Sequence, residues 1–176
     1  MVRRFIAGVA LASVAACSVA GCGSEEKKDG PEVAWAGKAC GVLTKGTPLQ
    51  VPKLDNASVL KSKASLVKLL EGISERMRTL EMGLAGLGAP PVGNGKALFT
   101  TAMSNLTSTH STVTTASRNL ERAKVTDKKS LERAVGQLGK AFGKYGAYQG
   151  PEQDFRKDPK LNAAFDKAPA CKSQGS

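Results

Sequence analysis

Few residues of this 176-residue chain have the types and spacing that catalysis requires. The only histidine, His110, lies in a Ser- and Thr-rich stretch, which predicts a solvated histidine on a helix. Glu71 and Glu75 are one helical turn apart, but the basic residues around them favour ordinary surface ion pairs. The sequence has no G-x-S-x-G or H-E-x-x-H motif and no phosphate-binding glycine loop. We therefore predict a protein that is not an enzyme, with no catalytic residue, metal or cofactor.

One motif is specific, and its chemistry is attachment rather than catalysis. Val19-Ala20-Gly21-Cys22 follows the pair Arg3-Arg4 and the uncharged residues 5–19, which is the order of a signal peptide. The tetrapeptide resembles a bacterial lipobox. The resemblance implies that residues 1–21 are removed and that the Cys22 thiol carries a diacylglyceryl anchor with acyl chains such as palmitate. A membrane-spanning helix over residues 5–23 is the alternative, although this run is near the lower length limit and consists mainly of small residues.

The layout of the whole chain resembles that of small actinobacterial lipoproteins of uncharacterised role. Its parts are a lipobox, a polar tether, Trp35 shortly before Cys40, several helices, and Cys171 near the end of the chain. The resemblance implies a secreted protein that is held by its lipid at the extracytoplasmic face of the cell membrane. Because only the lipobox is specific, the resemblance implies a location and not an activity.

The four cysteines fall into two pairs. Cys17 lies in the expected signal peptide and Cys22 would be acylated, so the folded part keeps only Cys40 and Cys171. Exported proteins fold in an oxidising compartment, so we predict a disulfide between these two residues. Closing so long a loop stabilises a fold by about 4–5 kcal/mol in the chain-entropy model. Two free thiols are the alternative, and the lack of a C-x-x-C pair argues against a redox or metal role.

Apolar residues recur at steps of three and four, which predicts three long helices. The first begins near residues 55–58 and ends at 86–91, the second covers about 94–124, and the third covers about 127–149. The seam of the first helix consists of Leu66, Leu70, Ile73, Met77, Leu80, Leu84 and Leu87. The seam of the second consists of Phe99, Ala102, Leu106, Thr109, Val113, Ala116 and Leu120.

Three stripes run along the third predicted helix. The apolar stripe consists of Leu131, Val135, Leu138, Phe142 and Tyr145. About 100° from it lies a glycine stripe of Gly136, Gly139, Gly143, Gly146 and Gly150. Nearly opposite the apolar stripe lies a cationic stripe of Lys129, Arg133, Lys140 and Lys144.

The glycine stripe needs a physical reason, because each interior glycine costs up to about 1 kcal/mol relative to alanine. One hypothesis is close packing against the small-residue seam of the second helix. The other is a groove for an acyl chain or a partner helix. The residues that would form this groove are Gly139, Phe142, Gly143, Tyr145, Gly146 and Tyr148. Compositional drift toward glycine and alanine is a third possibility.

Two short helices complete the predicted fold. One covers residues 33–45, and the other covers residues 159–167 behind an Asp158 cap and is ended by Pro169. The fold class is therefore an all-α, up-and-down bundle of three long helices, with two short terminal helices joined by the Cys40 and Cys171 disulfide. Residues 22–32 are a polar tether, residues 33–172 form the bundle domain, and residues 173–176 form a flexible tail.

Charge indicates the class of partner. The formal net charge is +11, and it falls to +9 when the signal peptide, with two arginines and no acidic residue, is removed. Outside the cytoplasm a basic surface meets anionic lipids and wall polymers, so we expect no nucleic acid as partner. We predict an interaction module whose cationic stripe binds an anionic envelope polymer or an envelope protein. The alternative is a carrier that holds a lipid or other apolar ligand beside the glycine stripe.

Overall fold

The computed structural model describes residues 29–45, 49, 51–53, 55, 57–143 and 148–172. These residues form seven helices and no strand, which confirms the predicted all-α bundle. The expected signal peptide, Cys22, most of the polar tether and the tail of residues 173–176 lie outside the described residues. In the part of the chain that is described, no helix has the length and apolar content needed to cross a membrane.

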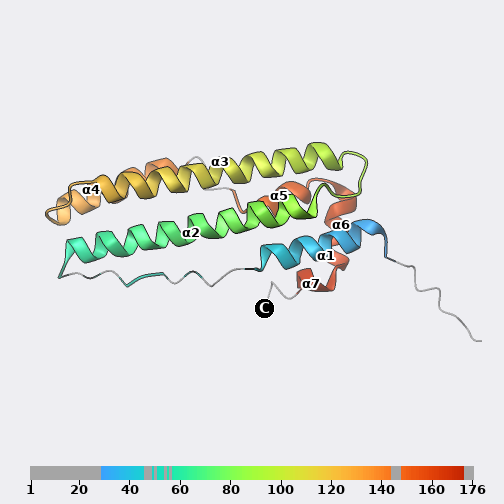
Figure 1. Cartoon of the computed structure of the whole chain (residues 1–176), viewed down its shortest axis with the longest axis horizontal. Coiled ribbons are helices and arrows are strands. Elements are labelled where there is room, and N and C mark those ends of the chain that lie inside the picture. Colours follow the sequence, from blue (N-terminus) through green and yellow to red (C-terminus); the bar gives the residue numbers. More distant parts are fainter. Residues whose placement is uncertain are drawn as a thin grey trace, which may run out of the picture.

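Helices α2 (Val59–Leu87) and α3 (Gly95–Arg122) lie side by side and antiparallel through the centre of the molecule (Figure 1). The Ser58 hydroxyl accepts a hydrogen bond from the Lys61 N–H and so caps the start of α2, as its residue type predicts. Gly88, with a φ of 75°, ends the same helix in a backbone conformation that favours glycine. Both long helices therefore have the bounds that periodicity and capping indicated.

The predicted seams hold α2 and α3 together. On α3 every seam residue is buried except Phe99, which is half-buried. On α2 Leu70 and Leu84 are buried, and the other five seam residues are half-buried. This central pair supports two separate hydrophobic cores, one toward each of its ends.

We call the first region the disulfide end. It consists of α1 (Pro31–Leu43), α5 (Pro151–Phe155), α6 (Pro159–Lys167) and α7 (Pro169–Lys172), packed near the end of α2 and the start of α3 (Figure 1). Its core is aromatic. Phe155 meets Trp35 and Phe165 with ring centroids 5.0 and 6.5 Å apart, and all three side chains are buried. The Trp35 indole N–H donates to the Gly88 carbonyl over 3.0 Å, which ties α1 to the end of α2.

The predicted disulfide is confirmed. Cys40 and Cys171 are bonded, with their Cα atoms 5.2 Å apart. The predicted position of Cys171, directly after the last helix, is wrong. Pro169 begins a further short helix, α7, and Cys171 lies in it. The bond thus joins α1 to α7, and α6 is held against α1 by packing. Helix α5 was not predicted, because five residues are too few to display a helical period.

We call the second region the α4 end. It consists of α4 (Lys128–Gly143) packed on α3 and, less extensively, on α2. Its core is made of small and aliphatic residues, with Leu70, Val113, Leu120, Val125 and Ala134 buried. The prediction of a helix to residue 149 is wrong, because residues 148–150 are not helical and α4 is described only to Gly143. The repeated glycines lower the helix propensity of this segment.

The boundary between tether and bundle also differs from the prediction. Helix α1 begins at Pro31, so Pro31 and Glu32 belong to the folded part rather than to the tether. Proline is favoured in the first turn of a helix because its missing N–H has no partner there anyway. Figure 1 places this start of α1 near the end of α2, which is the end of the central pair away from the start of α4.

Candidate functional sites

The cationic stripe lies on the exposed surface of α4. Lys129, Arg133 and Lys140 are all exposed, and within the described residues none of them forms an ion pair. Lys144 lies outside the described residues. We call Lys129, Arg133 and Lys140 the cationic face. Unpaired exposed cations in a row present a field that an extended anion can meet at several points.

The start of α4 is fixed by a reciprocal cap. The Asp127 carboxylate accepts from the Ser130 N–H over 2.7 Å, while the buried Ser130 hydroxyl accepts from the Thr126 and Asp127 N–H groups. The hydrogen bonds from Ser130 to the Asp127 carboxylate, with the charge of Arg133 as a smaller cause, lower the pKa of Asp127. The cap stabilises the first turn of α4, which carries Lys129.

Charge is unevenly distributed between the two ends. Residues 118–143 carry seven basic and three acidic side chains, a formal excess of four positive charges. Residues 29–45 and 148–172, which make up the disulfide end, carry seven basic and six acidic side chains, an excess of one. Of the acidic residues in the first set, Asp127 caps α4 and Glu132 lies 3.9 Å from Lys128. The α4 end is therefore the more cationic of the two.

The glycine stripe does not pack against α3. Gly136, Gly139 and Gly143 are exposed, and a Cβ added at any of them would meet no atom within 4 Å. The packing hypothesis is therefore wrong for these three glycines. Val135, expected in the apolar stripe, is also 40% exposed, and the buried positions are Ser130 and Ala134. The face toward the bundle is thus rotated slightly from the predicted one.

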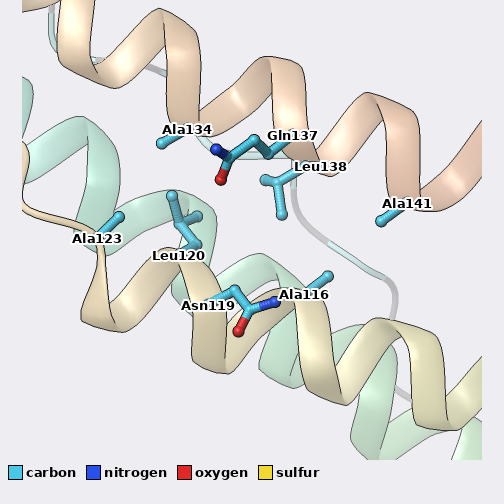
Figure 2. A pocket seen from close by; sticks show the side chains of 8 residues that line it. All are labelled: Ala116, Asn119, Leu120, Ala123, Ala134, Gln137, Leu138 and Ala141. Carbon is cyan, nitrogen blue, oxygen red and sulfur yellow. The ribbon is translucent and has the colours of Figure 1, made fainter.

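Alanines occupy the contact that was expected of the glycines. Figure 2 shows Ala134 and Ala141 of α4 facing α3, where Ala116 and Ala123 lie on the opposite wall of a small cavity. Leu120 and Leu138 point toward one another in the same gap. The cavity has a volume of about 40 Å³, which is room for a few waters, whereas ligand pockets usually measure about 300 Å³ or more.

The structure brings together few of the residues proposed for the groove. Phe142 is half-buried and packs against the core of the α4 end, while Gly139 and Gly143 face open space. Tyr148 comes after α4 and is half-buried; burial and the negative charge of Asp154 raise its pKa. Tyr145 and Gly146 lie outside the described residues. The groove therefore stays a prediction.

An unpredicted polar cluster lies between α2 and α3. The Ser74 hydroxyl is 2.9 Å from His110 Nε2, and His110 Nδ1 is 3.1 Å from both carboxylate oxygens of Glu81. The Thr114 hydroxyl is 2.9 Å from the Ser74 hydroxyl. The prediction of a solvated histidine is wrong, because the His110 side chain is only 21% exposed and has two partners. We call these four residues the Ser74 cluster.

The two long helices position the cluster through their turns. Ser74 and Glu81 are seven residues apart on α2, so they share one face, and His110 and Thr114 are one turn apart on α3. Each pair lies beside its apolar seam, where two antiparallel helices meet. The sequence shows polar residues beside the apolar seam of each helix. It does not show which of them face each other, because that depends on the register between α2 and α3.

The Ser74 cluster opens into a shallow depression of about 290 Å³. The lining residues are Glu71, Ser74, Glu75, Thr114, Ser117, Arg118 and Glu121. Arg78 donates two hydrogen bonds to the Glu75 carboxylate, and this lowers the pKa of Glu75. Among the described residues, no group of three or more His, Cys, Asp or Glu side chains is placed to hold a metal ion.

Comparisons of this chain with protein-family models, with curated proteins and with solved structures find no match.

Proposed function

We propose that the protein is a membrane-anchored interaction module whose cationic face binds an anionic polymer of the cell envelope. The observation that carries this proposal is the row of exposed, unpaired Lys129, Arg133 and Lys140 on the more cationic end of the described molecule. The lipidated Cys22 would hold the chain at the extracytoplasmic face of the membrane. Binding, rather than catalysis, is the main role in this proposal.

The geometry of the bundle supports a partner away from the anchoring membrane. Helix α1 begins at Pro31 near the end of α2, whereas α4 begins beside the start of α2 (Figure 1). A helix of 29 residues is about 43 Å long. A chain anchored ahead of α1 would thus present the cationic face tens of ångströms from its point of attachment. That distance favours a polymer in the envelope over the headgroups of the same membrane.

The carrier hypothesis has less support. A carrier needs a pocket of a few hundred Å³ lined mainly by apolar side chains. The cavity between α3 and α4 measures about 40 Å³, and a Cβ added at Gly136, Gly139 or Gly143 would meet no atom of the described residues within 4 Å. We keep polymer binding as the proposed function for this reason.

The anchor is tested by the variant Cys22→Ala. A diacylglyceryl group supplies two acyl chains, which is the number that stable membrane attachment needs. We expect the variant to lose fatty-acid labelling and to leave the membrane fraction. Labelling of the variant as strong as that of the wild type would contradict the lipobox assignment.

Polymer binding is tested with immobilised inorganic polyphosphate and the full-length chain in detergent. We expect Lys129→Glu, Arg133→Glu and Lys140→Glu together to weaken binding at least about tenfold. Affinity of the wild type should fall by about 10- to 40-fold between about 50 and 200 mM salt, as expected when about three bound counterions are released. The matched control changes Lys38, Lys160 and Lys172 of the disulfide end, which are also exposed, to glutamate. An equal loss in both triple variants would show that net charge alone drives binding and would overturn the proposal.

A further inference from the structure

We propose that Ser74 is a nucleophile, activated by His110 and Glu81, that accepts the acyl group of a carboxylic ester carrying a positive charge near its carbonyl. This activity is additional to polymer binding and independent of it. It differs from the sequence-based prediction that the chain is not an enzyme. Three features of the structure support it: the order of the hydrogen bonds, the access to Ser74, and the charge of the surrounding depression.

The hydrogen bonds run in the direction that nucleophilic catalysis requires. A carboxylate only accepts hydrogen bonds, so its contact with Nδ1 places the proton of a neutral His110 on that nitrogen. The Nε2 lone pair then faces the Ser74 hydroxyl at 2.9 Å and accepts its proton. When the Ser74 proton is used in this way, the Thr114 hydroxyl, 2.9 Å away, is left as the donor to the Ser74 oxygen. Glu81 thus orients the base, and His110 activates the nucleophile, which are the roles of a Ser-His-carboxylate triad.

The residues of the Ser74 cluster differ in burial and in access to solvent. The side chains of His110 and Glu81 are 21% and 20% exposed, so water competes only partly for their hydrogen bond. Ser74 and Thr114 also line the open depression of about 290 Å³, so a small ester can reach the hydroxyl from solvent. A purely internal polar contact between two helices would not need this opening.

The proposed reaction has two steps, acylation of Ser74 and hydrolysis of the acyl-Ser74 ester. The Ser74 oxygen attacks the ester carbonyl carbon while its proton passes to His110 Nε2. The bond from the carbonyl carbon to the alcohol oxygen then breaks, and His110 returns the proton to the leaving alkoxide. A water molecule next attacks the acyl-Ser74 ester with His110 again as base, which releases the carboxylic acid and restores the Ser74 hydroxyl.

The helical backbone around Ser74 and His110 limits the rate of acyl transfer. The backbone N–H groups around Ser74 and His110 are used within α2 and α3, so the developing oxyanion must be held by side chains. Thr114 and Arg118 are one turn apart on α3 and line the depression. Removing one oxyanion donor from an established hydrolase costs about 100- to 1000-fold in rate. We therefore expect both steps to be slow, and we expect acyl-Ser74 to accumulate only with an ester whose good leaving group makes acylation faster than hydrolysis of the acyl-Ser74 ester.

The lining of the depression selects the substrate class. Glu71, Glu75 and Glu121 contribute three carboxylates against the single guanidinium of Arg118. Glu75 is already paired with Arg78, which leaves Glu71 and Glu121 free of described ion pairs on the two sides of the opening. Carboxylates there attract an ammonium or guanidinium group and repel an anionic acyl group.

The test uses full-length protein in detergent with the cationic ester 4-nitrophenyl 4-guanidinobenzoate. We expect a burst of about one nitrophenolate per chain, with the acyl group located on Ser74 by mass spectrometry. The uncharged 4-nitrophenyl benzoate should react several-fold more slowly. Ser74→Ala should abolish the burst, and His110→Gln should slow it by about 100-fold or more. Ser111→Ala, which removes an exposed serine next to His110 in sequence, is the matched control and should react at the wild-type rate.

A purely structural cluster gives different results. In that case, Ser74→Ala and His110→Gln change the melting temperature, but no acyl group is found on Ser74. Labelling confined to surface lysines, or an unchanged burst in His110→Gln, would also overturn the proposal. Adding imidazole to His110→Ala should restore acylation of Ser74, a response that a structural role does not produce. Polyphosphate binding of Ser74→Ala should equal that of the wild type, so failure here is distinguishable from failure of the proposed function.

Discussion

The two ends of this molecule share α2 and α3 but are stabilised in different ways. The disulfide end joins four short helices through a disulfide, three buried aromatic rings and the Trp35 hydrogen bond. The α4 end relies on one helix, an aliphatic core and alanines in its contact with α3. The first end is closely packed and nearly balanced in charge, whereas the second exposes cations and glycines. This difference indicates that packing is tighter at the disulfide end, and under the proposed function the α4 end is the one that binds the partner.

The largest expected effect comes from removing a core aromatic ring. Phe155→Ala should lower the free energy of unfolding by about 3–5 kcal/mol, because the fully buried ring contacts Trp35 and Phe165. Leu138→Ala at the α4 end should cost only about 1–2 kcal/mol, because Leu138 is half-buried. Chemical denaturation of the two variants measures both values. Equal losses would show that the two ends are equally well packed.

Loss of the disulfide should have the next largest effect. The double variant Cys40→Ala and Cys171→Ala should lower the free energy of unfolding by about 2–5 kcal/mol, because the unfolded chain regains the entropy of an open loop. Hydrogen exchange should rise in α1 and α7 and stay unchanged in α4. Faster exchange of α4 in this variant would mean that the two ends do not open independently.

Glycine substitutions should have opposite signs at the two ends. A Cβ at Gly83 would lie 2.5 Å from Cγ1 of Val42, where α1 contacts α2, so Gly83→Ala should destabilise by about 1–3 kcal/mol. Gly139→Ala and Gly143→Ala add a methyl group in open space, so each should stabilise by up to about 1 kcal/mol through helix propensity. Thermal unfolding measures the three shifts. A stabilising Gly83→Ala would remove close approach as the reason for that glycine.

The smallest expected effect concerns pH at the start of α4. Hydrogen bonds from Ser130 lower the pKa of Asp127 in the folded state, so Asp127 contributes stability above its unfolded pKa near 3.8. That contribution is lost as the pH falls through the lower folded value. We expect amide exchange in the first turn of α4 to gain an additional acid-induced opening at low pH, and Asp127→Asn to remove this pH dependence. An identical profile in both proteins would contradict the cap.

The sequence predicted the long helices, whose apolar residues repeat over many turns. It missed the features that depend on the register between helices. The seams of α2 and α3 were found because seven residues at helical spacing leave little choice of buried face. The disulfide was predicted by counting the cysteines that would remain if residues 1–21 were removed as a signal peptide and Cys22 were acylated. Helix α5, with Phe155 at its end, has no period to detect. The Ser74 cluster depends on how α2 aligns with α3, which no residue pattern in either helix specifies.

The glycines of α4 show the limit of arguing from composition. Of the five glycines in the predicted stripe, Gly136, Gly139 and Gly143 lie on α4, Gly146 is outside the described residues, and Gly150 precedes α5. Ala134 and Leu138 pack in the core that α4 shares with α3, and the glycines lie about a quarter turn away in open space. A rotation of one helix about its axis is enough to exchange these roles, and a single sequence does not fix that rotation.

Hydrogen exchange of the full-length chain with and without polyphosphate tests the division of roles most directly. We predict slower exchange in α4 and the end of α3 when the polymer is bound, with α1, α6 and α7 unchanged. Slower exchange confined to the disulfide end, or no change in any helix at low salt, would contradict the account.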